Sequence, residues 1–240
     1  MYLSVIIPAY NEEERLPKTL REVDKYLRTK DYESEIIVVS DGSTDKTVEV
    51  VENLITEIKN LRLVEFEKKR GKGFGVRQGM LKASGQYRVF TDADNSTSID
   101  QVEKMWPYFD QGYDIVIGSR DIKGAVIAVP QTWFRRRLGD IFNLISQIIS
   151  GLWGIWDTQC GFKGFTKKAA SDIFPRTVID RFAFDVEVLI LAKKLGYKFK
   201  EIPIVWMNDP ESKVKFKSMV EMLIDVFKIK LNFIKNIYGI

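Results

Sequence analysis

The chain has 240 residues, 45% of them hydrophobic, which is enough for one domain with a buried core. Its formal charge of +4 at pH 7 is too small to predict a nucleic-acid partner, although basic residues gather near position 135 and after position 213. One cysteine and no histidine exclude an internal disulfide, a zinc site built on cysteines, and a Ser-His or Cys-His nucleophile system.

The first apolar run, residues 3–8, is short and lacks the basic start and cleavage pattern of a signal peptide. No apolar run reaches the ~20 residues that a membrane-spanning helix needs. We therefore expect a protein of the reducing cytoplasmic compartment that touches a membrane only peripherally, if at all.

Strands and helices alternate along the first half of the chain. Runs rich in β-branched and aromatic residues predict strands at 3–7, 36–39, 61–66, 87–90 and 115–118. Apolar residues at helical spacing predict helices at 16–27, 48–58 and 73–83, and Ser98 with Gln101 has the spacing of a capping box. This alternation predicts an α/β fold with a doubly wound, mostly parallel sheet and helices on both of its faces.

Two carboxylates follow the predicted strand 87–90. Residues i and i+2 leave a strand on the same side, so Asp92 and Asp94 could converge on one hard cation with oxygen ligands. The carboxyl ends of strands are also where ligands bind in α/β sheets. Acidic residues after a strand are equally typical of an ordinary turn, so the Asp-x-Asp pattern alone leaves both interpretations open.

Two further loops have the composition of a nucleotide site. Asp41 ends the strand 36–39 at the same expected sheet edge, where its carboxylate could accept a hydrogen bond from a base or ribose, although Asp-Gly-Ser is also a common turn. The stretch 70–75, Arg-Gly-Lys-Gly-Phe-Gly, places two cations among glycines ahead of a helix, which suits a diphosphate. A flexible surface loop is the alternative for this stretch.

The second half contains three helical patterns. Residues 133–156 carry a wide apolar face next to three arginines, which could lie on a membrane, on the core or on a second subunit. Residues 184–192 open with Asp185 near the helix N-terminus, where a capping role is the simple alternative. Residues 213–240 carry an apolar stripe made of Val220, Leu223, Ile224, Phe227, Leu231, Ile234 and Tyr238. Such a helix needs a cover, either a membrane surface, the core or a dimer seam.

Three stretches, in this order and spacing, resemble glycosyltransferase family 2: Val5-Ile6-Ile7-Pro8-Ala9-Tyr10-Asn11-Glu12, Ser40-Asp41-Gly42-Ser43-Thr44-Asp45 and Thr91-Asp92-Ala93-Asp94. Within that family the chain most resembles the dolichyl-phosphate (polyprenyl-phosphate) β-glucosyltransferases. That likeness is carried by the motifs at 70–73, 76–79, 118–120, 157–163 and 184–187. The resemblance covers residues 1 to about 213 and implies the nucleotide-diphospho-sugar transferase (GT-A) fold.

The resemblance also implies roles for individual residues. It implies a nucleotide-sugar pocket lined by Pro8, Tyr10, Glu12, Asp41, Lys72, Asp92 and Ala93. Asp92 and Asp94 would hold Mg²⁺ or Mn²⁺, and Asp185 would lie on the acceptor side. From charge alone, the candidates to hold an acceptor phosphate are Arg120, Arg135, Arg136 and Arg137, with a solvated basic face as the alternative. Asp157 and Gln159 could reach sugar hydroxyls, with turn roles equally open, and Cys160 is expected to be a packed residue.

The chain departs from the family at two places. Mannosyltransferase relatives often have glutamine two residues past the second metal aspartate, where this chain has Ser96, so a third protein ligand is left open. Those relatives also carry an arginine near a Ser-Lys pair after the last strand, whereas the sequence here is Asn208-Asp209-Pro210-Glu211 before Ser212-Lys213. The second departure favours glucose over mannose.

We therefore expect a catalytic domain at 1–212 and an amphipathic helical tail at 213–240 that contacts a membrane interface or a second subunit. The expected activity is inverting, metal-dependent transfer of a hexose, glucose from UDP-glucose, to a polyprenyl or dolichyl phosphate, as protein glycosylation requires. Two alternatives are a family 2 transferase that acts on a saccharide hydroxyl and a catalytically silent nucleotide-sugar-binding protein.

Overall fold

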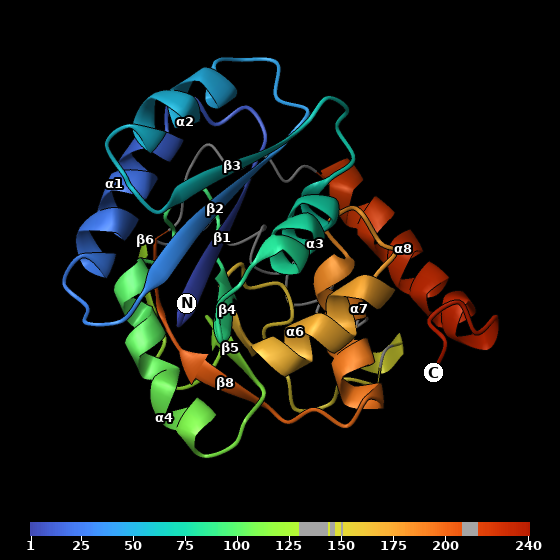
Figure 1. The fold of residues 1–240 in the computed structure, drawn as a ribbon. Helices are drawn as coiled ribbons and strands as arrows, with labels where there is room; N and C mark the ends of the chain where they lie inside the picture. The colour runs from blue at the N-terminus through green and yellow to red at the C-terminus, as the bar shows by residue number, and fades with distance from the viewer. Residues whose placement is uncertain (130–143, 145–146, 150, 208–215) are drawn as a thin grey trace.

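The computed structural model describes residues 1–129, 144, 147–149, 151–207 and 216–240. In this part of the chain, seven strands form one sheet in the order β3-β2-β1-β4-β7-β5-β8 (Figure 1). The strands are β1 (Leu3–Ala9), β2 (Ser34–Asp41), β3 (Leu61–Phe66), β4 (Tyr87–Phe90), β5 (Ile115–Ser119), β7 (Lys163–Thr166) and β8 (Phe199–Pro203). Neighbouring strands run parallel, except that β7 is antiparallel to both β4 and β5. The predicted mostly parallel sheet is confirmed.

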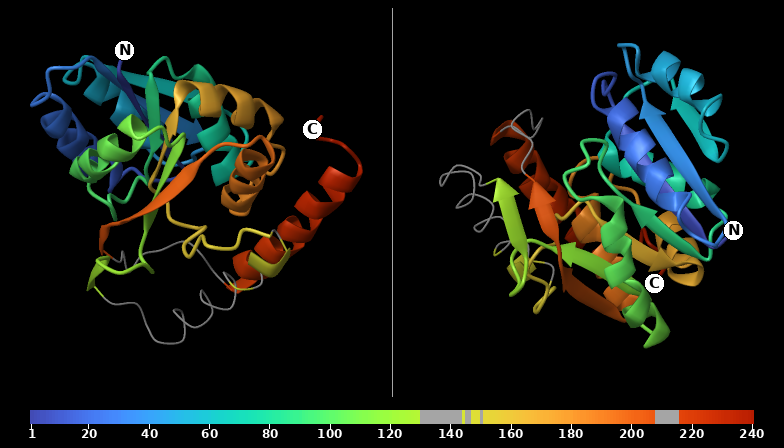
Figure 2. Two further views of the ribbon diagram at one scale, coloured as in Figure 1. Left: turned by 90° about the horizontal axis from the view of Figure 1, so that it is seen from below. Right: turned by 90° about the vertical axis from the view of Figure 1, so that its left-hand side faces the viewer.

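Helices cover both faces of this sheet (Figure 1, Figure 2). One face packs against α1 (Leu16–Leu27), α2 (Thr47–Ile55), the 3-10 helix η1 (Ile99–Lys104) and α4 (Trp106–Asp110). The other packs against α3 (Lys72–Lys82), α6 (Lys167–Ile173), η2 (Phe174–Arg176), α7 (Phe184–Lys194) and α8 (Phe216–Ile234). Because both faces are covered, the strands read as unbroken apolar runs: Ile6 enters one core, and its neighbours Val5 and Ile7 enter the other.

Helix α3 lies unusually close to strand β1. A side chain at Gly79 would overlap the buried Ile6, and a Cβ atom at Gly75 would lie 3.2 Å from the Cβ atom of Pro8. The two glycines are four residues apart, so they share the helix face that meets the sheet. This close approach places Lys72, the first residue of α3, at the carboxyl end of the central strands.

Two local predictions were wrong. Ser98 and Gln101 do not form a capping box. The Gln101 side chain instead donates to the carbonyl oxygen of Val205 at 2.7 Å and accepts from the Val205 amide at 2.6 Å. The predicted helix at 133–156 ends before residue 151, and the described residues 151–156 form turns in which Gly151 and Gly154 have positive φ. Most of that predicted helix, with Arg135, Arg136 and Arg137, lies outside the described residues.

A second, smaller sheet pairs β6 (Val126–Val129) with β9 (Val205–Met207) in parallel. Neither strand was predicted. Both follow strands of the main sheet closely: β6 comes shortly after β5, and β9 comes directly after β8.

The C-terminal helix α8 packs one of its faces onto the domain (Figure 2). Met222, Val226 and Ile229 are buried in the core that contains α7. Asp225 accepts two hydrogen bonds from the Arg181 guanidinium, at 2.9 and 3.1 Å. The predicted tail is therefore attached to the preceding part of the chain by both apolar and charged contacts.

We expect Gly79→Ala to lower the free energy of unfolding by up to about 2 kcal/mol. Overpacking a buried site costs about 1–3 kcal/mol, while alanine gains about 1 kcal/mol over glycine inside a helix. Because the added methyl group overlaps the immobile side chain of Ile6, the steric cost should exceed the gain. Urea unfolding measures the difference, with Leu81→Ala on the exposed side of the same helix as the control. A more stable Gly79→Ala protein would contradict the tight contact.

Candidate active site

Several polar residues converge at the carboxyl edge of the central strands. Strands β2, β1 and β4 run parallel side by side, so Asp41 at the end of β2 lies on the same edge as Asp92 beyond β4. The antiparallel strand β7 begins at this edge, where Lys163 pairs with Phe90. Helices α3 and α7 also begin here, with Lys72 and Asp185 in their first turns.

The turn after β4 presents two carboxylates on one side. Ala93 is buried in the core, and its carbonyl oxygen accepts a hydrogen bond from Thr19 Oγ1 at 2.7 Å. The flanking Asp92 and Asp94 are only half-buried. Burial and the charge of Asp92 together raise the pKa of Asp94, although the Ser96 amide donates to its carboxylate at 2.9 Å. The alternation matches the expected geometry of residues i and i+2.

Lys72 lies among three carboxylates. Its Nζ atom is 2.5 Å from Asp92 Oδ1. Burial lowers the pKa of Lys72, but the charges of Asp92, Asp185 and Asp94 outweigh burial and raise it. The side chain is therefore a permanent ammonium at neutral pH, positioned beside the predicted metal ligands.

Asp185 is paired with Lys163, which the sequence interpretation missed. The Lys163 Nζ atom is 2.5 Å from Asp185 Oδ1 and also donates to the carbonyl oxygen of Cys160. Both side chains are buried. Burial raises the pKa of Asp185, against the opposing charges of Lys163 and Lys72. The available signal was a lysine between Phe162 and Phe165, in a stretch that is otherwise apolar.

The loop before β7 also touches the acidic turn. A side chain at Gly161 would overlap the carboxylate of Asp92. Cys160 is buried beside it, as predicted for a packed residue. The run 160–163 thus supports both Asp92, through Gly161, and Asp185, through Lys163.

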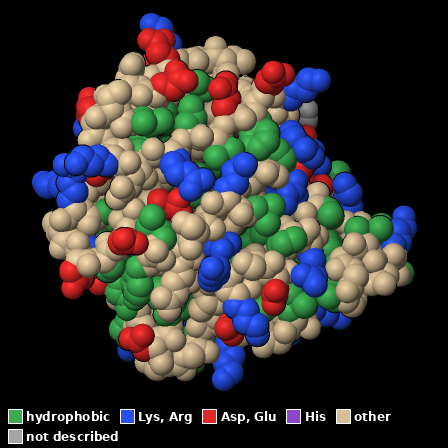
Figure 3. Space-filling view, in the orientation of Figure 1, with side chains coloured by type: hydrophobic (Ala, Val, Ile, Leu, Met, Phe, Trp, Pro, Cys, Tyr) green, Lys and Arg blue, Asp and Glu red, His purple; other side chains and the backbone are tan. Residues whose placement is uncertain are grey.

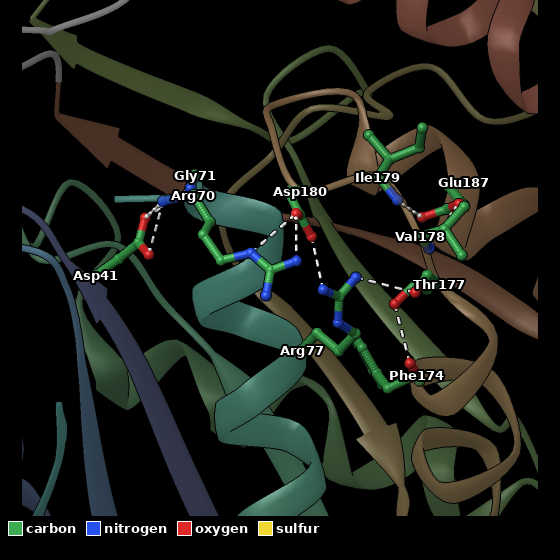
Figure 4. Close-up of polar contacts among 10 residues, drawn as sticks. All are labelled: Asp41, Arg70, Gly71, Arg77, Phe174, Thr177, Val178, Ile179, Asp180 and Glu187. Carbon is green, nitrogen blue, oxygen red and sulfur yellow. Dashed lines mark hydrogen bonds and ion pairs between the residues drawn. The ribbon is translucent and has the colours of Figure 1, made fainter. Parts of the chain in front are cut away.

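Asp41 binds the protein's own backbone. Its carboxylate accepts hydrogen bonds from the amides of Arg70, at 3.0 Å to each oxygen, and Gly71, at 2.6 Å (Figure 4). The side chain is buried. These contacts hold the 70–71 turn ahead of Lys72, and the contact of Asp41 with a base or ribose stays a prediction.

Three other predicted nucleotide-pocket residues lie at the end of β1 or just after it. The Lys69 Nζ atom lies 3.5 Å above the ring of Tyr10, and the Glu12 carboxylate pairs with Arg15 at 2.6 Å. Pro8, still within β1, contacts α3 at Gly75. All three predicted residues lie at the same sheet edge as Asp41, and their role in binding a nucleotide stays a prediction.

Arg120 and Asp157 form a bidentate pair. The Arg120 guanidinium donates to the two carboxylate oxygens of Asp157 at 2.7 and 2.8 Å, and its backbone amide adds a bond of 3.0 Å. Asp157 is fully buried and both of its carboxylate oxygens accept from Arg120, which favours the structural alternative over contact with a sugar hydroxyl. Gln159 keeps a buried Nε2 atom that has no hydrogen-bond partner among the described residues.

The residues present fit a divalent cation by their chemistry. Asp92 and Asp94 offer carboxylate oxygens, the ligands that Mg²⁺ and Mn²⁺ prefer, and Mg²⁺ commonly binds one or two carboxylates plus substrate phosphates. In the described parts of the chain, no group of three or more Asp, Glu, Cys or His side chains is placed to hold a metal. Two carboxylates with phosphate oxygens would therefore be the donor set.

Residues 4–174 match the family described as Glycosyl transferase family 2. The chain is 36% identical over 252 residues to the dolichyl-phosphate beta-glucosyltransferase ALG5D of Trichomonas vaginalis, covering 100% of this chain and 76% of the relative. It is 34% identical over 249 residues to the human dolichyl-phosphate beta-glucosyltransferase, covering 97% of this chain and 76% of that relative.

Solved structures show the same fold. Glucosyl-3-phosphoglycerate synthase from Mycobacterium tuberculosis, in complex with Mn²⁺, UDP and phosphoglyceric acid, superposes with a TM-score of 0.69 at 17% identity, covering 100% of this chain and 79% of that one. S. aureus TarS 1-349 with UDP-GlcNAc gives a TM-score of 0.59 at 20% identity, covering 97% and 67%. At these identities the likeness shows the fold alone, and the expected GT-A fold is confirmed.

We expect Lys163→Met to destabilise the protein by about 3–5 kcal/mol, because it leaves the buried Asp185 without its ammonium partner. The double variant Lys163→Met/Asp185→Asn should recover much of that loss, since it removes both charges. Urea unfolding at pH 7 of the wild type, Lys163→Met, Asp185→Asn and the double variant gives the coupling free energy. Additive losses in the double variant would show that the two side chains do not act as a pair.

Proposed function

Because the chain belongs to glycosyl transferase family 2 and is a glycosyltransferase, we propose that it transfers glucose from UDP-glucose to dolichyl phosphate or a related polyprenyl phosphate. The observation that carries the proposal is the cluster of Asp92, Asp94, Lys72 and Asp185 at the carboxyl edge of the sheet. Relatives named dolichyl-phosphate beta-glucosyltransferases, 34–38% identical over nearly the whole chain, support the choice of sugar and acceptor.

The reaction is a single displacement at the anomeric carbon. An oxygen of the lipid phosphate forms the new bond to carbon 1, and the bond from carbon 1 to the UDP oxygen breaks, so the configuration inverts. A Mg²⁺ or Mn²⁺ ion on Asp92 and Asp94 would neutralise the charge that develops on the leaving diphosphate. Lys72 adds a fixed positive charge next to Asp92, where the same diphosphate is expected.

A phosphate acceptor needs little base catalysis. Its second pKa is roughly 6, so the attacking oxygen is already an anion at neutral pH. This agrees with a chain that has no histidine. Asp185, whose carboxylate binds Lys163, then serves to position groups on the acceptor side rather than to remove a proton. Arg120, together with Arg135, Arg136 and Arg137, which lie outside the described residues, is proposed to hold the acceptor phosphate.

The lipid acceptor requires contact with a membrane, and α8 has a face that suits it. Five apolar side chains spaced three or four residues apart are 44% to 74% exposed: Val220, Ile224, Phe227, Leu231 and Ile234. Lys228 and Lys230 are exposed on the same helix and Lys235 directly after it, and Figure 3 shows hydrophobic and basic side chains together over α8. Among the described residues, no helix is long and apolar enough to cross a bilayer.

The energies favour an interfacial helix. Full burial of each exposed apolar side chain contributes about 1.5–3 kcal/mol, and each lysine near an anionic surface adds about 1 kcal/mol. The apolar contribution is therefore the larger one even when it is halved for partial burial. We propose that the outer face of α8 lies on the membrane that contains the acceptor, while its inner face stays on the domain.

We expect Asp92→Asn and Asp94→Asn each to lower kcat for glucose transfer at least a hundredfold, because each removes one anionic ligand of the cation. The assay supplies UDP-glucose, Mn²⁺ and either a short polyprenyl phosphate or a saccharide, and identifies the glucosylated product. Asp100→Asn, an exposed acid on the same segment, serves as the control. Near-normal turnover in either variant would refute the metal assignment, and glucose found only on the saccharide would refute the lipid acceptor.

We expect the triple variant Ile224→Gln/Phe227→Gln/Leu231→Gln to lose at least nine-tenths of its binding to anionic liposomes in a flotation assay. Truncation is a poorer test because it would also uncover the core around Val226 and Ile229.

The matched control is Ile55→Gln/Leu81→Gln, which removes exposed apolar side chains outside α8 and should float like the wild type. High salt should weaken the wild-type binding without abolishing it, since the apolar contribution dominates. Equal flotation of the wild type and the triple variant would refute the membrane face. A wild type that does not float but is a dimer, made monomeric by the triple variant, would assign the face to a subunit contact.

A further inference from the structure

The segment 177–181, between η2 and α7, is hydrogen-bonded to Glu187 of α7. Each carboxylate oxygen of Glu187 accepts one backbone hydrogen bond, from the amides of Val178 and Ile179, both at 3.0 Å (Figure 4). The hydroxyl of Tyr238 donates to the same carboxylate at 2.8 Å. Glu187 is fully buried. Its hydrogen bonds thus tie the segment both to α7 and to the C-terminal part of the chain.

The same segment is also bound by two arginines, Arg77 of α3 and Arg70 just before that helix. Asp180 accepts from Arg77 Nη2 at 2.6 Å, and its other oxygen accepts from Arg70 at 3.1 and 3.3 Å. Arg77 also donates to the carbonyl oxygen of Thr177 at 2.9 Å. The Arg77 side chain is only 12% exposed, so this pair is less screened by solvent than a surface ion pair. Figure 4 shows Asp180 between the two arginines.

The backbones of the two segments also touch. The amide of Phe74 donates to the carbonyl oxygen of Asp180 at 3.0 Å. A side chain at Gly71 would overlap that carbonyl group, and one at Gly73 would lie 2.5 Å from the Cβ atom of Phe184. The glycines on both sides of Lys72 therefore allow this close contact between the segment 177–181 and the start of α3.

This contact joins the two halves of the active site. Lys72 lies between Gly71 and Gly73, and Asp185 directly follows Phe184. The position of the Lys72 ammonium relative to Asp92 and Asp185 therefore depends on how the segment 177–181 sits against α3. The proposed mechanism assigns no role to Asp180, Arg77 or Glu187, and none of them lies among the reacting groups.

We propose that Asp180 and Glu187 are positioning residues of the transfer reaction, which fix the segment 177–181 and so hold Lys72 in place for the leaving diphosphate. The inference rests on the proposed function. A substitution of Asp180 should therefore lower the rate of transfer because Lys72 is displaced, and not because the protein unfolds.

A double-mutant cycle between Asp180 and Lys72 tests this inference. Asp180→Asn keeps the size of the side chain and removes the charge that binds Arg70 and Arg77. We expect it to lower kcat for glucose transfer about tenfold and to change KM for the polyprenyl phosphate less than twofold. In a Lys72→Met background the same substitution should have no further effect, since the group that it positions is gone.

The affinity for UDP with Mg²⁺, measured by calorimetry, gives the same cycle without relying on turnover. Asp180→Asn should weaken UDP binding in the wild-type background and leave it unchanged in the Lys72→Met background. Asp24→Asn, which breaks the exposed ion pair with Arg28 at 2.7 Å, is the control for loss of an Asp–Arg pair and should change neither quantity. If Asp180→Asn does not fold, Arg77→Gln removes the other partner of the Asp180 carboxylate and enters the same cycle.

The inference would be overturned if Asp180→Asn changed kcat and UDP affinity by the same factor in the wild-type and Lys72→Met backgrounds. It would also be overturned if the Asp180→Asn protein had the kcat and UDP affinity of the wild type. A wild-type protein that neither binds UDP nor transfers glucose would instead refute the proposed function. Glu187→Gln adds a second arm, because it preserves the shape of the residue and one strong acceptor. Its smaller loss of kcat should also vanish in the Lys72→Met background.

Discussion

The charge balance at the carboxyl edge of the sheet is the constraint on which the active site depends. Asp92, Asp94 and Asp185 lie close enough for their charges to act on one another, and among the described residues the ammonium groups of Lys72 and Lys163 pair with two of them. Within this described set of five side chains, three carboxylates against two ammonium groups leave one net negative charge. Such a site favours an additional cation, and it explains why each lysine lies 2.5 Å from an acid, since an unpaired buried charge is costly.

Close backbone packing delivers these groups to one place. The glycine-rich run that begins α3 has the composition of a phosphate-binding loop, yet Gly71 and Gly73 face the segment before α7, and Gly75 and Gly79 face β1. The helix is therefore clamped between the sheet and that segment. Lys72 begins this helix, so its position is fixed by packing of α3 against the core and not by a flexible loop.

Helix α8 has two different faces with two different consequences. Its inner face closes the core through Val226 and Ile229 and pairs Asp225 with Arg181. Its outer face leaves long apolar side chains in solvent. Tyr238, which follows α8, donates to Glu187, the residue proposed to help position Lys72. The C-terminal part of the chain therefore connects the proposed membrane helix with the segment that positions Lys72.

The sequence by itself determined the alternating strands and helices, the place of the acidic turn after β4, and the family, because these depend on local periodicity and on motifs of adjacent residues. Tertiary structure alone decided the partners of the charges. Lys163 meets Asp185 across 22 positions, and Asp157 meets Arg120 across 37, so Asp157 supports an arginine rather than a sugar. The antiparallel course of β7 was equally hidden, since Lys163-Gly164-Phe165-Thr166 has a charge and a glycine where a strand pattern would be apolar. Side-chain partners far apart in the chain are chosen by packing, which no local pattern records.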